Sequence, residues 1–180
     1  MKGTIVKCLE EVVRKNFGDE KWKAVLAAMG IDEARVFSTM EDVPDGTVVE
    51  MIGKVAAVLG ISKEAAMEAF GMHWSKTYAP RVYGVFFEKA KSARAFLLSL
   101  DGVHDTVTRR MENARPPRFV YDDKQPDRLV MRYDSPRGLV ALMPGLVKGV
   151  GALYGEEIDV ALAGNEVRIH FKSAASRRAA

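Results

Sequence analysis

The sequence predicts an α+β fold, in which an N-terminal helical lobe precedes a C-terminal lobe with an antiparallel sheet and packed helices. Apolar residues recur at helical spacing through the first two-thirds of the 180-residue chain. In the final third the pattern changes to alternation, and turn-forming residues separate the alternating runs. A hairpin-rich segment that follows a run of helices is typical of α+β proteins.

The helices follow from apolar spacing and from the residues that end them. Gly30 and Gly60 each close a helix, and Ser62 is in position to cap the next one, which is expected to bend at Gly71. Pro80 is expected to interrupt the helical region, and the proline pair at 116–117 to end it. Helices are expected over residues 5–16, 20–29, 48–59, 63–70 and 82–100, and over a stretch that carries Val103, Val107 and Met111.

The remaining elements form the sheet and one helix against it. Strands are expected over residues 118–122, 128–133, 158–162 and 167–171. Residues 163–165, Ala-Gly-Asn, form a hairpin turn between the last two strands. Residues 139–154 have helical spacing although Pro144 and Gly145 lie among them.

Composition narrows the class of protein. A net charge of +3 and short, mixed basic runs do not indicate nucleic-acid binding. The single cysteine, Cys8, excludes an intrachain disulfide and fits a cytoplasmic location, and no apolar run is long enough to span a membrane. Cys8 is either a thiol redox sensor or a buried residue on a helix, and its apolar neighbours favour burial.

His104 stands out among the three histidines, because it shares a helical face with apolar residues. An imidazole on such a face needs partners for both ring nitrogens. Taken alone, the pattern favours a core histidine bonded to a carbonyl. A zinc site lacks further ligands nearby, whereas haem iron needs only one axial ligand from the protein. His73 is assigned a structural role, and His170 is expected to point outward from the last strand.

A second set of polar residues lies at the end of the second predicted strand. Tyr133, Ser135 and Arg137 alternate, so they point the same way if this segment is extended. Two hydroxyls and a guanidinium then match carboxylates such as the two propionates of haem. The alternative is a strand end that continues into a turn.

Together these residues resemble the haem nitric oxide/oxygen binding (H-NOX) family, which is related to the sensor domain of soluble guanylate cyclase. The resemblance covers almost the whole chain. It rests on Met1-Lys2-Gly3-Thr4-Ile5-Val6, Gly71-Met72-His73-Trp74, Lys76-Thr77, Asp101-Gly102-Val103-His104, Pro116-Pro117-Arg118 and Tyr133-x-Ser135-x-Arg137. It implies one domain over residues 1–175, with a helical lobe at about 1–65, a sheet lobe at about 66–175 and haem b buried between them. Residues 176–180 are then a tail or linker.

The resemblance assigns roles position by position. His104 matches the proximal iron ligand, and Tyr133, Ser135 and Arg137 match the residues that bond the propionates. Pro117 and Ile5 match residues packed against the porphyrin. Leu142, Tyr78 and Trp74 fall in the distal pocket.

The gas is predicted from the distal residues. Oxygen-binding members have a distal tyrosine where this chain has Leu142, which cannot donate a hydrogen bond to bound O₂. The resemblance therefore implies a sensor of NO, which also binds CO and excludes O₂. NO would weaken or break the bond to His104, and the lobes would then rotate. The alternative is an O₂ sensor in which Tyr78 is the distal donor.

The sequence also leaves two other functional classes open, a haem-dependent enzyme and a protein-binding module without a cofactor. A haem-dependent enzyme would need distal acid and base groups, which the chain has few of, and the prediction is therefore a non-enzyme. A module that binds a protein without any cofactor would lack a haem spectrum. In the H-NOX family the output is a histidine kinase, a diguanylate cyclase, a cyclase or a fused chemotaxis receptor, and the sequence does not choose among them.

Overall fold

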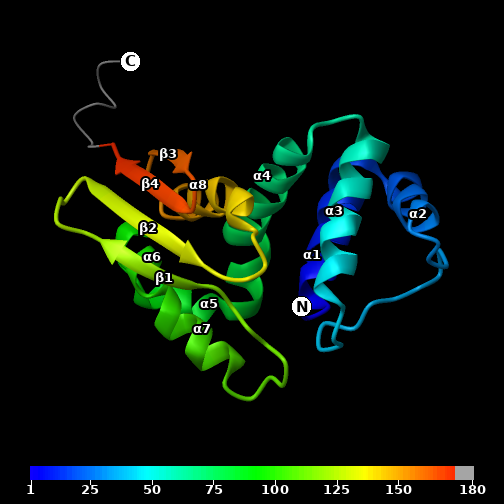
Figure 1. Ribbon diagram of the computed structural model, residues 1–180, viewed down its shortest axis with the longest axis horizontal. Helices are drawn as coiled ribbons and strands as arrows, with labels where there is room; N and C mark the ends of the chain where they lie inside the picture. The colour runs from blue at the N-terminus through cyan, green and yellow to red at the C-terminus, as the bar shows by residue number, and fades with distance from the viewer. Residues whose placement is uncertain (173–180) are drawn as a thin grey trace.

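The structure of the chain is a computed structural model that describes residues 1–172 (Figure 1). It confirms the α+β class and the order of its parts. The helices are α1 (Thr4–Phe17), α2 (Asp19–Ala28), α3 (Asp45–Leu59), α4 (Lys63–His73), α5 (Ala79–Lys89), α6 (Ala93–Leu98), α7 (Leu100–Thr108) and α8 (Met143–Leu153), with a π-helical turn η1 (Trp74–Tyr78) and a 3₁₀ turn η2 (Val140–Leu142). The strands are β1 (Arg118–Asp122), β2 (Arg128–Asp134), β3 (Ile158–Ala163) and β4 (Glu166–Phe171). The predicted tail at 176–180 lies outside the described residues.

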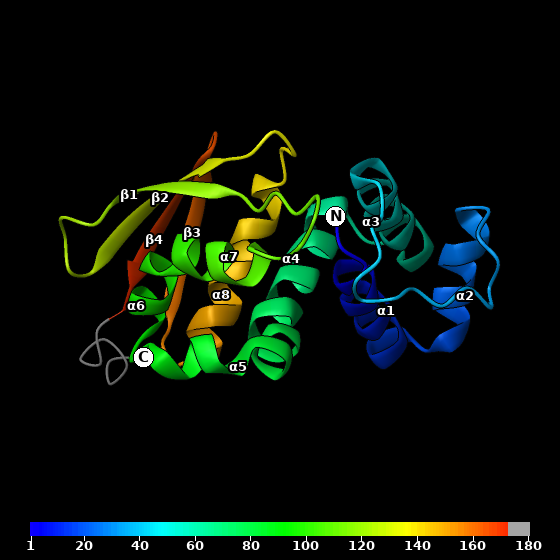
Figure 2. The same cartoon turned by 90° about the horizontal axis from the view of Figure 1, so that it is seen from below.

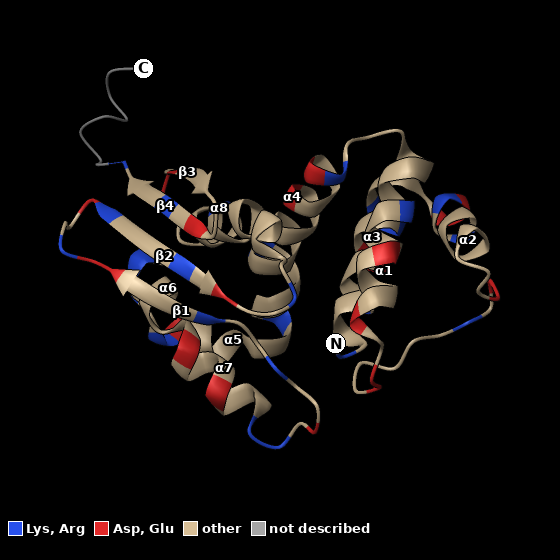
Figure 3. Cartoon of the chain, viewed as in Figure 1, with Lys and Arg blue, Asp and Glu red and all other residues tan. Residues whose placement is uncertain are grey.

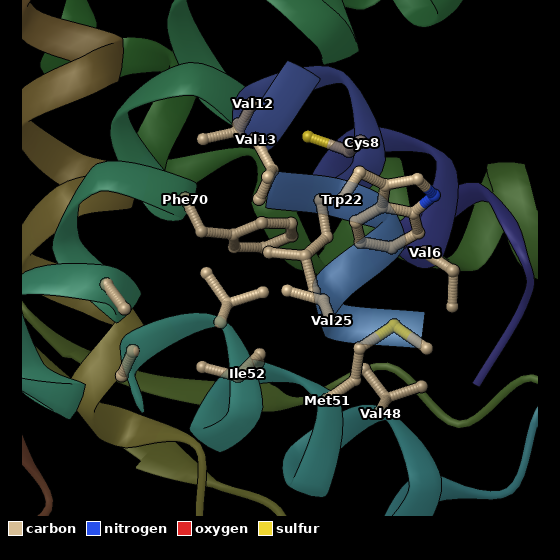
Figure 4. Packing of buried hydrophobic residues seen from close by; sticks show 14 of the residues in the cluster. Val6, Cys8, Val12, Val13, Trp22, Val25, Val48, Met51, Ile52 and Phe70 are labelled. Atoms are coloured by element: carbon tan, nitrogen blue, oxygen red, sulfur yellow. The ribbon is translucent and has the colours of Figure 1, made fainter. Parts of the chain in front are cut away.

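The first hydrophobic core lies among α1, α2, α3 and α4 (Figure 4). One face of α1 enters it, as the apolar spacing predicts, and Cys8 on that face is fully buried. Burial also raises the pKa of the Cys8 thiol far above its ordinary range. Trp22 of α2 is 1% exposed and closes the core from the other side. Cys8 is therefore a packing residue, and its thiolate form is disfavoured.

The second core lies between the sheet and the helices on one of its faces (Figure 2). The four strands are antiparallel in the order β1-β2-β4-β3. Alternate residues of β2 point inward, so Leu129, Met131 and Tyr133 are buried against residues of α6 and α8. The opposite face of the sheet carries polar residues, among them the exposed His170, as predicted.

Two predicted boundaries are wrong. Pro80 does not interrupt the chain's helical path, since it lies in the first turn of α5, where no backbone N–H is needed. The π-helical turn η1 leads directly from α4 into α5. The expected helix over 82–100 is instead divided, because Ala90 has extended backbone angles and the Ser92 side chain accepts a hydrogen bond from the Ala95 N–H and starts α6.

Helices α4 and α8 cross at very close range. A Cβ atom built on Gly145 of α8 would clash with the carbonyl oxygen of Glu68 in α4 and lie 2.8 Å from its Cα atom. A Cβ atom built on Gly149 would likewise lie 2.8 Å from the carbonyl oxygen of Met72. Glycine allows this approach because it has no side chain. The two helices therefore join the first core to the second with little freedom between them.

Charged residues are distributed over both parts of the molecule. Lysine and arginine occur beside aspartate and glutamate over most of the ribbon in Figure 3, whereas α7 carries only acidic residues, Asp101 and Asp105. Among the described residues, none of the helices combines the length and the apolar character that a membrane crossing needs.

Candidate functional site

His104 lies on α7, and its ring is held by the chain that enters β1. Its Nδ1 atom is 3.2 Å from the carbonyl oxygen of Pro117. A carbonyl only accepts, so Nδ1 carries the proton and donates it. Nε2 then has a free lone pair, and it has no hydrogen-bond partner within residues 1–172. Histidines that bind metals usually donate their other ring N–H in this manner.

The electrostatic surroundings of His104 favour the form that binds iron. Burial lowers the pKa of His104, and the hydrogen bond to Pro117 opposes this effect only in part. The neutral imidazole is therefore preferred, and metal binding requires that form. A second contact, from the Arg118 guanidinium to the Asp105 carboxylate, also ties α7 to β1. The Pro117 carbonyl thus selects one tautomer of His104, and the Asp105–Arg118 contact holds the helix that carries it.

The apolar face of α7 is incompletely covered by protein. Leu100, Val103 and Val107 are only half-buried, and no residue of this helix is fully buried. Half-buried apolar residues also occur on the first core's side, where Ile5, Trp74, Ala141 and Leu142 pack against the cluster. Half-buried apolar side chains on both parts of the fold are available to a further apolar group.

The segment after β2 is a turn, so the expectation of an extended Tyr133-to-Arg137 segment is wrong beyond Asp134. The strand ends there, the Arg137 backbone N–H donates to the Ser135 hydroxyl at 3.4 Å, and Gly138 has a φ of 62°. Ser135 therefore uses its oxygen to form the turn. Tyr133 remains in the strand, 8% exposed, and its hydroxyl has no partner in the described part of the chain.

Arg137 joins the two parts of the molecule. Its Nε atom is 2.5 Å from a carboxylate oxygen of Asp45, at the start of α3, and one terminal nitrogen donates to the Arg115 carbonyl. The second Asp45 oxygen is 2.6 Å from the Met1 amino group. Sequence reasoning missed Asp45, since it lies 92 residues from Arg137 and no local pattern marks it. Two of the five guanidinium N–H groups are used here, so others remain for a further carboxylate.

The residues predicted for the distal pocket belong to the first core or pack against it. Tyr78 is buried in the first core, and Ile5, Trp74 and Leu142 pack against that core. The Trp74 and Tyr78 rings stack at 5.4 Å. Leu142 ends η2 and offers only apolar surface. The Tyr78 hydroxyl is 3.3 Å from the Thr4 hydroxyl, a partner that the sequence did not indicate.

His73 lies outside this group. Its Nε2 atom is 2.9 Å from a carboxylate oxygen of Glu11, and Arg81 bonds the other oxygen of the same carboxylate at 2.5 Å. These contacts join α1 to α4 and α5, which is a structural role. Within residues 1–172, no three histidine, cysteine, aspartate or glutamate side chains lie close enough together to hold a metal ion by themselves.

The residues present fit a haem in three respects. His104 provides one nitrogen with its lone pair free, Tyr133 and Arg137 carry donors suited to carboxylates, and half-buried apolar side chains occur on α7 and beside the first core. Pro117 is half-buried beside His104, and its carbonyl orients the imidazole.

The chain is also similar to known proteins over most of its length. The sequence model of the haem-NO-binding family matches residues 2–162. Two soluble guanylate cyclases of Caenorhabditis elegans are similar, gcy-32 with 26% identity over 83% of this chain and gcy-34 with 25% identity over 93%. The matched regions are only 22% and 25% of the length of those relatives.

Solved structures show the same fold. An oxygen-binding H-NOX domain related to soluble guanylate cyclases, in its oxygen complex, has a TM-score of 0.80 and 26% identity, with 96% of each chain covered. An H-NOX protein from S. oneidensis in the Fe(II)NO state has a TM-score of 0.85, covers 96% of this chain and 100% of its own, and at 19% identity supports the fold alone.

Proposed function

Because the chain belongs to the haem-NO-binding family, whose members are haem-based gas sensors related to soluble guanylate cyclase, we propose that it senses nitric oxide with a haem bound through His104. The observation that carries this assignment is the fixed tautomer of His104, with Nδ1 bonded to Pro117 and Nε2 free. Haem iron, when bound, supplies the position at which a diatomic gas is coordinated.

The haem in this proposal is haem b, held without covalent bonds to the protein. Covalent attachment of the c type requires cysteines beside a histidine. The chain has one cysteine, Cys8, and it is buried in the first core. Tyr133 and Arg137 then hold the propionates, while Ile5, Pro117 and the half-buried residues of α7 contact the porphyrin faces.

The preference for NO over O₂ rests on Leu142. Bound O₂ carries partial negative charge and is stabilised by a hydrogen-bond donor, which leucine lacks. NO on ferrous iron depends much less on such a donor. The test is a set of absorption spectra of the ferrous protein alone and with each gas. We expect stable complexes with NO and CO, and no stable oxygen complex in air. A preparation without a Soret band would contradict the haem assignment, and a stable oxygen complex would contradict the selectivity.

The signal in this proposal starts at His104. His104 would hold the haem iron while the Pro117 carbonyl supports its imidazole, and a change at this ligand would reach α7 and β1 together because the Asp105–Arg118 contact joins them. The Arg137–Asp45 ion pair then passes the change to α3. The relatives extend far beyond the matched region, which supports an effector outside this domain. The chain acts as a sensor and performs no chemistry on a substrate, so peroxide turnover should be absent.

Substitution of Arg137 is expected to weaken haem binding. Charged hydrogen bonds contribute about 1.5–3 kcal/mol each, so Arg137→Gln should speed haem loss by about 10-fold to 100-fold. Asp45→Asn is the matched control, because it removes the ion pair and leaves the guanidinium available to the propionates. The rate of haem transfer to a scavenging apoprotein measures both. Equal rates in Arg137→Gln and wild type would show that Arg137 serves only the contact between α3 and the turn after β2.

A further inference from the structure

A single carboxylate of α1 binds side chains on both sides of the π-helical turn η1. The Glu11 Oε1 atom is 2.9 Å from Nε2 of His73, the last residue of α4. The Oε2 atom is 2.5 Å from a terminal nitrogen of Arg81, in the first turn of α5. An ionised carboxylate only accepts hydrogen bonds, so both nitrogens donate and both oxygens of Glu11 are used. The two ends of η1 are therefore tied to one point on α1.

The surroundings of Glu11 keep this carboxylate ionised. The hydrogen bond from Arg81 is the main cause that lowers the pKa of Glu11, burial opposes it, and the hydrogen bond from His73 lowers the pKa further. The His73 side chain is 11% exposed, so little water competes for its contact. The Arg81 side chain is more exposed, and its guanidinium also lies over the Tyr78 ring, 5.2 Å from the centroid. Glu11 is therefore charged at neutral pH and has one buried and one exposed partner.

The turn η1 is also packed against α8, a helix of the second core. A Cβ atom built on Gly149 of α8 would lie 2.9 Å from the Cβ atom of Ser75 in η1, and Ser75 is buried. In Figures 1 and 2, α4 lies between α8 and α1. The Glu11 carboxylate thus reaches from the first core to an element that rests on the second. This junction is separate from the ion pair between Arg137 and Asp45.

We propose that the Glu11 carboxylate is a latch, a contact that holds α1 against η1 and α5 in the gas-free protein and opposes movement between the two parts. Ion pairs with an exposed member are weak and exchange readily with water. The latch therefore opens without exposure of the apolar core. The inference rests on the proposed function only for what opens the latch, which is the binding of NO. Coupling between two equilibria is reciprocal, so removal of the latch should also strengthen NO binding.

The first test compares amide hydrogen exchange in gas-free, ferrous, haem-loaded Glu11→Ala and wild type. Alanine removes both acceptors and keeps the helix, so we expect the amides of η1 and of the first turn of α5 to exchange about 5-fold faster. Glu10→Ala is the matched control, because Glu10 accepts hydrogen bonds from two side chains of α1 itself and should exchange as wild type does. Exchange in Glu11→Ala at the wild-type rate overturns the inference.

Arg81→Gln opens the same contact from the other side. The Arg81 side chain is 56% exposed, so this variant remains informative even if Glu11→Ala does not fold. It should speed exchange of the same amides in the gas-free protein. Wild-type exchange in Arg81→Gln would show that the contact holds neither α5 nor η1, and it would overturn the inference.

The link to gas binding is measured with NO on the same proteins. NO should speed exchange of these amides in wild type and have little further effect in Glu11→Ala, where the latch is already open. We expect NO to dissociate about 5-fold more slowly from Glu11→Ala than from wild type, and at the wild-type rate from Glu10→Ala. A contact that only stabilises the fold would lower Tm and leave NO dissociation unchanged, and that result overturns the inference. Failure of the proposed function is seen separately, as a wild-type protein with no Soret band or with a stable oxygen complex.

Discussion

Replacement of His104 by alanine is expected to remove the axial bond to iron and to change the ferrous spectrum completely. Loss of residues that merely support a metal ligand typically reduces affinity by about 10-fold to 100-fold, so loss of the ligand itself should cost at least about 100-fold in haem affinity. His104→Gly leaves space for free imidazole, which should restore the spectrum without restoring the covalent link to α7. Haem titration and absorption spectra measure both effects.

The chain provides its own controls for this substitution. His170→Ala removes an exposed histidine on the outer face of the sheet and should leave the spectrum unchanged. The imidazole-rescued His104→Gly protein should bind NO without the lobe movement that we expect in wild type, since the free imidazole is not attached to α7. If the lobes move equally in both proteins, the tether between His104 and the signal does not exist.

Gly145→Ala is expected to destabilise the fold although it adds only one methyl group. The new Cβ atom would lie 2.8 Å from the Cα atom of Glu68 and closer still to its carbonyl oxygen, so α4 and α8 must separate. Overpacking of a core costs typically 1–3 kcal/mol, and a clash with backbone belongs at the upper end, about 3 kcal/mol. For a chain of this size that lowers Tm by roughly 6–12 °C. Thermal unfolding followed by circular dichroism measures the shift.

Gly53→Ala is the matched control for helix propensity. Gly53 also lies inside a helix, α3, but a Cβ atom there would have no neighbour within 4 Å. Alanine is a better helix former than glycine, so this variant should be stabilised by about 0.5–1 kcal/mol. If Gly145→Ala lowers the free energy of unfolding and Gly53→Ala raises it, the loss of stability comes from the crossing of α4 and α8. A stable Gly145→Ala protein would show that α4 and α8 can adjust their distance freely.

Local patterns in the sequence were sufficient for most of the fold. Apolar spacing located α1, α2 and α3, and alternation located all four strands, because burial of one face imposes these periods. The pattern did not find the division between α5 and α6, since Ser92 acts as a cap inside an otherwise helical run. Apolar spacing also does not predict the π-helical turn η1, which carries the chain from α4 into α5 so that Pro80 lies within a continuous helical path.

The candidate site also has a part that local sequence patterns predict and a part that they do not. Its separate residues lie in recognisable motifs, so His104 and the residues around Arg137 were identified from the chain alone. Their partners were not, because Asp45 and Thr4 meet Arg137 and Tyr78 only through the packing of distant elements. The alternatives for His104 also turned out to be compatible, since one ring nitrogen bonds a carbonyl and the other remains free. Its role as an iron ligand stays a prediction.

The burial of Cys8 makes a useful reporter experiment possible. It is the only cysteine in the sequence, it is 0% exposed, and burial keeps it in the unreactive thiol form. Cysteines introduced at Glu20 on α2 and Val120 on β1, whose side chains are exposed, would therefore be the only thiols that react with a spin label. The distance between two such labels, measured before and after addition of NO, would report directly on movement between the helical part and the sheet without any change to the wild-type core.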